Sequence, residues 1–207
     1  MTADTARMHR LTLRFADAQL EKDFAEEQAR KALKPFRAAM ICVAVVMFII
    51  WLLMDKLLPQ IPDAKARLSM PMLVMLAILA YGYARSYMRS FLRMHQLSVL
   101  AGAWALAAAL VGICSLMPRA SLDAVGMMVI VHTLNVYSIV RLRFPVACYC
   151  GWGTAAIYLG YLSYTGALEG TELARHASML LLANLFGMIA AFQMDQSARR
   201  ARCRWRK

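Results

Sequence analysis

Six long stretches of the chain contain no charged residue, and polar, mostly basic segments separate them. Each stretch is 17 to 25 residues long, which matches the roughly 17–25 apolar residues that an α-helix needs to cross a bilayer. The pattern therefore predicts an all-α membrane protein built as a bundle of six transmembrane helices. The predicted crossings are residues 38–54, 68–87, 96–117, 122–140, 144–164 and 176–193.

Lysine and arginine are unequally divided between the two sides of the predicted bundle. The N-terminal segment, the second and fourth connections and the C-terminal segment hold 19 of the 24 basic residues. Short loops rich in Lys and Arg face the cytoplasm, so both termini are expected there. No secretory signal is visible, because the first apolar stretch begins only after Arg37. We expect a multi-pass protein of the bacterial inner membrane.

The N-terminal segment, residues 1–37, is predicted to be cytoplasmic. Residues 1–12 are expected to lack regular structure, and an amphipathic helix over about 17–34 is expected to begin at Asp17 as N-cap. Its basic end predicts that it lies on the anionic membrane surface. Pro35 is expected to form the elbow before the membrane domain, residues 38–193.

Residues 194–207 form a basic connector or tail. From Gln193 to Lys207 there is no Pro or Gly, which predicts that the last helix extends into the cytoplasm. Two interpretations remain open. A rigid extension could transmit a shift of the bundle, whereas the same basic residues could simply anchor the last helix at the membrane surface.

Composition agrees with the membrane prediction and removes several function classes. The chain is 61% hydrophobic and 17% charged, with mean hydropathy +0.50, whereas a soluble domain is about 45–50% apolar and about 25% charged. The loops leave no room for a soluble catalytic domain, so no enzyme activity is expected in this chain. Topology accounts for the net charge of +12, and no nucleic-acid partner is expected.

Polar residues inside the predicted crossings are the candidates for a ligand site. His132 and Asn135 lie one turn apart in the fourth crossing, and Asn184 lies in the sixth. Counted from the outer ends of their helices, His132 and Asn184 are about 15 Å and 12 Å deep. They could bind a lipophilic ligand. The alternative is that they only hydrogen-bond between helices.

Other chemistry has less support in the sequence. Haem would need two axial ligands at one depth, and only His132 is deep. Cys148 and Cys150 lie two residues apart on a helix and point in different directions, which disfavours a copper site. No charged residue lies deep in a crossing, which disfavours ion-coupled transport. We expect no cofactor and no metal.

Small residues recur every four positions in the sixth crossing, at Ala183, Gly187 and Ala191. Such rows let helix backbones approach closely. The row predicts either packing inside the bundle or a face for a homodimer.

The two ends of the chain carry a family resemblance. The first consists of Leu13 to Asp17, Leu20-Glu21 and Phe24 before the basic run to Arg37; the second consists of Asn184 to Gly187, Ala190 to Gln193 and Ala198 to Arg200. Both resemble the six-transmembrane-helix (MASE-type) sensor domains of bacterial class III adenylate/guanylate cyclases and GGDEF diguanylate cyclases. The resemblance extends over about residues 13–203, and its middle part matches in hydropathy alone.

The resemblance implies a dimerising sensor that passes a signal down the last helix to a cyclase-type output domain. Gly187, Gln193 and Arg199 are then the expected relay residues. No G-G-[DE]-E-F motif occurs, so the implied chemistry lies outside these residues. The alternatives are a membrane scaffold that recruits partners, and a small passive transporter or metal handler.

Overall fold

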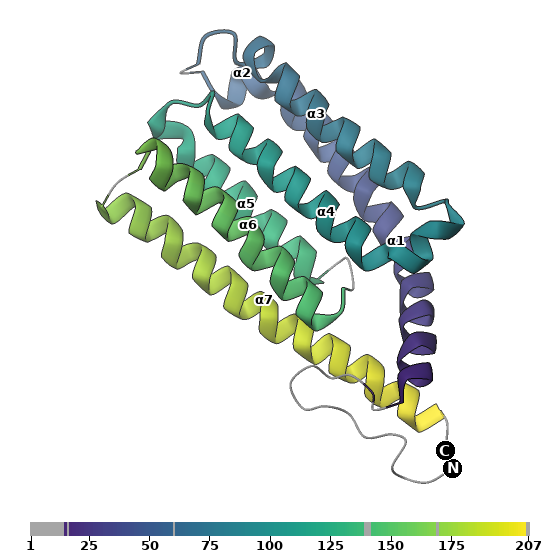
Figure 1. Cartoon of the computed structure of the whole chain (residues 1–207). Helices are drawn as coiled ribbons and strands as arrows, with labels where there is room; N and C mark the ends of the chain where they lie inside the picture. The colour runs from purple at the N-terminus through teal and green to yellow at the C-terminus, as the bar shows by residue number, and fades with distance from the viewer. Residues whose placement is uncertain (1–14, 16, 60, 139–141, 169, 206–207) are drawn as a thin grey trace.

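The computed structural model describes residue 15 and residues 17–59, 61–138, 142–168 and 170–205. Every regular element within these ranges is a helix (Figure 1). The elements are α1 (Ala18–Leu52), α2 (Met54–Leu57), α3 (Ala64–Arg85), α4 (Arg89–Cys114), the short 3-10 helix η2 (Arg119–Ser121), α5 (Leu122–Ser138), α6 (Phe144–Thr165) and α7 (Gly170–Trp205). The prediction that residues 1–12 lack regular structure lies outside the described residues.

The long helices form one bundle in which consecutive helices lie side by side (Figure 1). α3 packs against both α1 and α4, and α4 packs in turn against α5 and α6. α7 covers α5 and α6 along their length. The short connections after α4 and α5 keep α4, α5 and α6 together.

Four helices are long and apolar enough to cross a membrane: α1, α3, α4 and α7. α5 is apolar but only 17 residues long, and α6 has no charged residue over its 22 residues. Large apolar side chains face outward, for example Phe186 at 66% exposure and Leu73 at 60%. Water would disfavour such a surface. The all-α membrane character is therefore confirmed, while the number of six crossings stays a prediction.

Asp17 is the N-cap of α1, as predicted, because its carboxylate accepts hydrogen bonds from the backbone N–H groups of Gln19 and Leu20. The predicted separate amphipathic helix is wrong in one respect. α1 runs without interruption from Ala18 through Pro35 to Leu52, and Figure 1 shows it changing direction along its length. Proline in a helix interior can kink the helix without ending it.

The apolar face at the start of α1 is covered by protein. Phe15, Leu20 and Phe24 form a small buried cluster against Ala198 of α7. The apolar face is therefore packed against α7, which extends far enough to cover it, while the location of the basic end of this segment on the membrane surface stays a prediction. The predicted extension of the last helix is confirmed, since α7 continues to Trp205.

The row of small residues in α7 packs inside the bundle. Ala183 and Ala191 are buried, and a Cβ atom on Gly187 would collide with the ring of Tyr137. The first of the two interpretations of this row, packing within the bundle, is therefore the one that the structure adopts.

Candidate functional site

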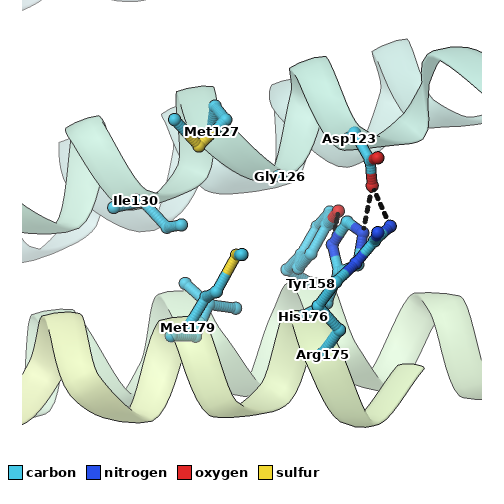
Figure 2. A pocket seen from close by; sticks show the side chains of 9 residues that line it. Asp123, Gly126, Met127, Ile130, Tyr158, Arg175, His176 and Met179 are labelled. Atoms are coloured by element: carbon cyan, nitrogen blue, oxygen red, sulfur yellow. Dashed lines mark hydrogen bonds and ion pairs between the residues drawn. The ribbon is translucent and has the colours of Figure 1, made fainter. Parts of the chain in front are cut away.

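A cavity of about 180 Å³ lies between α5 and α7, near the N-terminal ends of both helices. We call it the α5–α7 cavity; it is shown in Figure 2. It extends from Asp123 to Ile130 of α5, which is about 10 Å along the helix. Its lining residues are Asp123, Gly126, Met127, Ile130, Tyr158, Arg175, His176, Met179 and Leu180.

Hydrogen bonds join three helices at the polar end of this cavity. Nε2 of His176 lies 2.9 Å from Oδ1 of Asp123, and Nδ1 of His176 lies 3.0 Å from the Tyr158 hydroxyl. Arg175 donates to the same carboxylate oxygen at 2.6 Å. His176 and Tyr158 are buried, whereas the side chain of Asp123 is 63% exposed. The chain of contacts thus leads from the exposed helix end into the bundle.

The proton positions in this series of hydrogen bonds follow from which groups can donate and which can accept. An ionised carboxylate only accepts, so Nε2 of His176 carries the proton toward Asp123. In a neutral imidazole Nδ1 then accepts from the Tyr158 hydroxyl. In a protonated imidazole Nδ1 donates instead, and the Tyr158 O–H is released to donate elsewhere. The hydroxyl is therefore a donor or an acceptor toward the cavity according to the state of His176.

Gly126 makes room for the imidazole. A Cβ atom at this position would lie 2.7 Å from Cε1 of His176 and 2.8 Å from its Nδ1, closer than such contacts occur. At the other end, Met127 and Met179 give the cavity a flexible apolar wall. Polar groups at one end and apolar side chains at the other suit an amphipathic, lipophilic molecule.

Asn184 lies elsewhere in the core, and its polar groups are satisfied there. It accepts a hydrogen bond from the Tyr137 hydroxyl at 3.0 Å and donates to the Leu180 carbonyl at 2.9 Å. Added Cβ atoms on Gly151 and Gly187 would collide with Tyr137, so α5, α6 and α7 meet closely around this ring.

His132 faces a different neighbour. Its Nε2 lies 3.1 Å from the carbonyl oxygen of Ala103 in α4, and Asn135 is half-buried on the same helix. The structure therefore does not join His132 and Asn184 by hydrogen bonds, and the α5–α7 cavity is lined by other residues. Ligand binding by His132, Asn135 and Asn184 stays a prediction.

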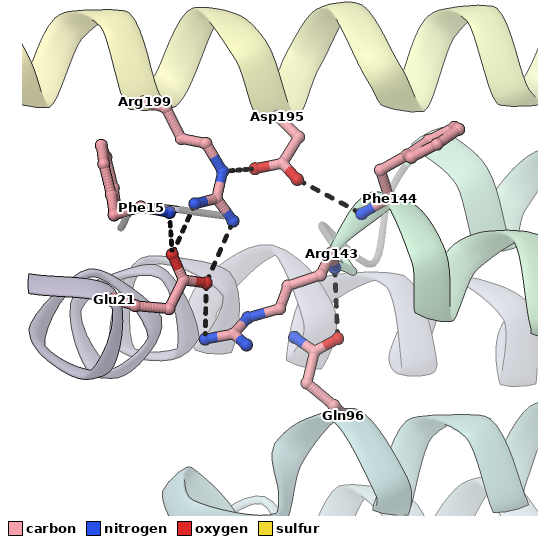
Figure 3. A network of polar contacts seen from close by, with 7 residues as sticks. All are labelled: Phe15, Glu21, Gln96, Arg143, Phe144, Asp195 and Arg199. Carbon is pink, nitrogen blue, oxygen red and sulfur yellow. Dashed lines mark hydrogen bonds and ion pairs between the residues drawn. The ribbon is translucent and has the colours of Figure 1, made fainter. Parts of the chain in front are cut away.

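A second polar network lies at the opposite end of α7, and we call it the Arg199 cluster (Figure 3). Arg199 is only 1% exposed. It donates to Asp195 of its own helix at 2.8 Å and to the two carboxylate oxygens of Glu21 in α1 at 2.7 and 3.3 Å. The guanidinium also lies 4.6 Å from the ring centre of Phe24. Removing one partner of such a buried pair costs about 3–5 kcal/mol.

The Arg199 cluster also reaches the connection before α6. Arg143 forms an ion pair with Glu21 at 3.4 Å, and its backbone N–H donates to Gln96 of α4 at 3.1 Å. Asp195 accepts from the backbone N–H at the start of α6. Four helices, α1, α4, α6 and α7, therefore meet at this cluster.

Glu21 is held in its charged form. Burial alone would raise its pKa, but the hydrogen bonds from Arg199 and from the backbone N–H of Phe15, together with the charges of Arg199 and Arg143, outweigh burial and lower the pKa of Glu21. The buried charges of the cluster thus compensate one another.

Of the predicted relay residues, Arg199 lies at the centre of a cluster, Gly187 packs against Tyr137, and Gln193 is exposed. Arg199 does not reach out to a membrane surface, because Glu21 and Asp195 bind it inside the protein. Sequence reasoning missed His176, Tyr158 and Asp123. The available signal was the presence of Asp123 and of the Arg175-His176 pair at the N-terminal ends of the predicted fourth and sixth crossings.

Among the described residues, no group of three or more His, Cys, Asp or Glu side chains is placed to hold a metal ion. The chain matches no protein-family model, no curated protein sequence and no solved structure.

Proposed function

We propose that the protein is a sensory module of the bacterial inner membrane, with six crossings and both termini in the cytoplasm. It binds a lipophilic ligand in the α5–α7 cavity and relays the bound state along α7. The signal regulates a cyclase-type catalytic domain, which belongs to the same chain or to a partner. The module itself works as a homodimer.

The observation that carries this proposal is the continuity of α7. One uninterrupted helix of 36 residues holds His176 in the α5–α7 cavity and Arg199 in the Arg199 cluster. The two residues are about 35 Å apart along the helix axis. A helix is stiff over this length, so a displacement at one end arrives at the other as a change in the packing of α7 against α1.

The polar chain around His176 suits a switch. A ligand with a hydroxyl or carbonyl group can replace Tyr158 as the partner of His176, or bind the released Tyr158 hydroxyl. Either change alters the contact that fixes α7 to α5 and α6 at this end. A ligand shifts a conformational equilibrium only by binding the two states unequally, so it must favour either the intact Tyr158–His176 contact or the arrangement in which this contact is broken.

The proposal is tested by fusing the catalytic domain of a class III adenylate cyclase after Lys207 of the full chain and measuring cyclic AMP in a strain without its own cyclase. His176→Phe disturbs the cavity and is expected to change output at least twofold. Met127→Trp, which fills the cavity from its exposed side, is the second variant. Arg200→Gln, an exposed neighbour of the cluster, is the control and is expected to leave output unchanged.

Coupling between the two sites is read from the double variant. In the Arg199→Gln background, His176→Phe is expected to have no further effect, because the path from cavity to connector is broken. Full persistence of the effect in that background contradicts the relay. Changes caused by His132→Ala, Asn135→Ala or Asn184→Ala, with none from His176→Phe, would instead place the ligand at the residues predicted from the sequence.

A further inference from the structure

An apolar groove of about 470 Å³ lies between α1 and α3 on the outside of the bundle. We call it the α1–α3 groove. It runs from Met40 to Phe48 along α1, about 12 Å. Ala44 and Ala80 are its small residues, and they leave room between the larger side chains. Its lining residues are Met40, Ile41, Ala44, Val45, Phe48, Leu76, Leu79, Ala80 and Tyr83.

The groove ends at a polar site on the basic side of the bundle. The two helices run antiparallel, so the Met40 end of α1 meets the Tyr83 end of α3. The hydroxyls of Tyr83 and Tyr87 lie 2.8 Å apart. Arg37, one turn before Ile41, lies over the ring of Tyr87 with its guanidinium carbon 3.7 Å from the ring centre.

Arg37 is held in this position by Ser86, the C-cap residue of α3. Its Nε donates to the Ser86 hydroxyl at 2.9 Å and its Nη2 to the Ser86 carbonyl at 2.6 Å. A fixed guanidinium beside two tyrosine hydroxyls is a site for a phosphate group, because arginine binds phosphate with directed hydrogen bonds. Arg30 and Lys34, both exposed on the preceding turns of α1, add positive charge.

We propose that the α1–α3 groove binds one acyl chain of an anionic phospholipid, whose phosphate lies at Arg37 and the Tyr83–Tyr87 hydroxyl pair. The apolar groove takes the chain and the basic end takes the headgroup, so shape and charge identify the same occupant. This site is separate from the α5–α7 cavity and does not depend on the proposed function.

The test is native mass spectrometry of the full chain after incubation with equal amounts of phosphatidylglycerol and phosphatidylcholine carrying the same acyl chains. We expect one retained lipid and at least a threefold excess of phosphatidylglycerol. Ala80→Trp fills the groove and is expected to lower retention at least fivefold. Ala77→Trp, on an exposed part of α3 outside the groove, is the matched control and is expected to retain lipid normally.

Headgroup recognition is tested at Arg37. Arg37→Gln is expected to bring the ratio of the two lipids close to one, and Arg37→Lys, which keeps the charge, to restore most of the preference. Ala44→Leu fills the groove from α1 and replaces Ala80→Trp if that variant does not fold. Equal retention in the filled and control variants, or equal binding of both lipids by the unmodified chain, overturns the proposal.

Discussion

Tyr137 occupies the space that two glycines leave where α5, α6 and α7 meet. Its hydroxyl is bound to Asn184, so the ring has a fixed position and cannot give way easily. Single residues therefore decide whether these three helices can approach one another. A hydropathy pattern alone does not predict this close packing.

Gly187→Ala is expected to lower the free energy of unfolding by about 1–3 kcal/mol, the usual effect of adding a methyl group to a filled core. Unfolding in mixed dodecyl maltoside and sodium dodecyl sulfate micelles measures it. Gly160→Ala is the control, because a Cβ atom there meets nothing within 4 Å; its stability is expected to be equal or higher. Equal loss in both variants would contradict the packing at Tyr137.

The lowered pKa of Glu21 predicts an acid-sensitive contact between α1 and α7. A carboxylate with a lowered pKa in the folded state contributes stability above its ordinary pKa of 4.5, and this contribution is lost as the pH falls through the lowered value. Spin labels at the exposed positions Lys22 and Ser197 are expected to show a narrow distance distribution at neutral pH that broadens below about pH 4.5.

Two variants control this pH experiment. Glu21→Gln removes the charge and is expected to show the broad distribution at every pH. Glu26→Gln changes an exposed residue of the same helix and is expected to follow the unmodified chain. A narrow distribution that persists in Glu21→Gln would mean that the apolar cluster around Phe24 holds the helices without the ion pair.

α1 is one helix although its sequence contains a proline. Pro35 has no N–H to donate and its ring crowds the preceding turn, so the first half of α1 can lean toward α7 while the second half packs against α3. Phe15, Leu20 and Phe24 on one side and the α3 contact on the other fix this arrangement.

Pro35→Ala is expected to straighten α1, because it restores a backbone hydrogen bond and removes the crowding. The distance between labels at Lys22 and Ser197 is then expected to lengthen. Pro71→Ala, at the proline inside α3, is the control and is expected to leave this distance unchanged. An unaltered distance in Pro35→Ala would show that the contacts of α7 alone set the course of α1.

The helices could be predicted because a helix that crosses a bilayer needs a long uncharged segment. Such segments can be recognised in a single sequence. Asp17 as N-cap and the long last helix followed from local signals. The junction of Glu21 with Arg199 did not, because no local rule relates residues 178 positions apart. His176 lies near a helix end, where the sequence gives it no special role, and only the fold brings Tyr158 and Asp123 to it.

At the scale of the whole molecule, polar networks lie at both ends of the bundle. One end is rich in basic residues and holds the Arg199 cluster, and the other end holds the polar contacts around His176. The Arg199 cluster and the Tyr83–Tyr87 site lie at the basic end, and the α5–α7 cavity lies at the other. The orientation of these ends in the membrane decides where each site meets its ligand.

Cysteine labelling in intact cells tests that orientation. In a background without the native cysteines, Glu172→Cys is expected to react with a membrane-impermeant maleimide, because the proposed topology puts the N-terminal end of α7 outside the cell. Ser197→Cys is expected to react only after permeabilisation. Reaction of both, or of Ser197→Cys alone, in intact cells would contradict the topology with both termini in the cytoplasm.

The long sequence separation between Glu21 and Arg199 has a consequence for biosynthesis. A ribosome adds about 5–20 residues per second, so Glu21 leaves it roughly 10–35 s before Arg199 does. Throughout that interval Leu20 and Phe24 lack the surface of α7 that later covers them. The Arg199 cluster therefore cannot close before α7 has been synthesised, and a chain whose translation stops before Arg199 keeps an open apolar face that quality-control proteases can recognise.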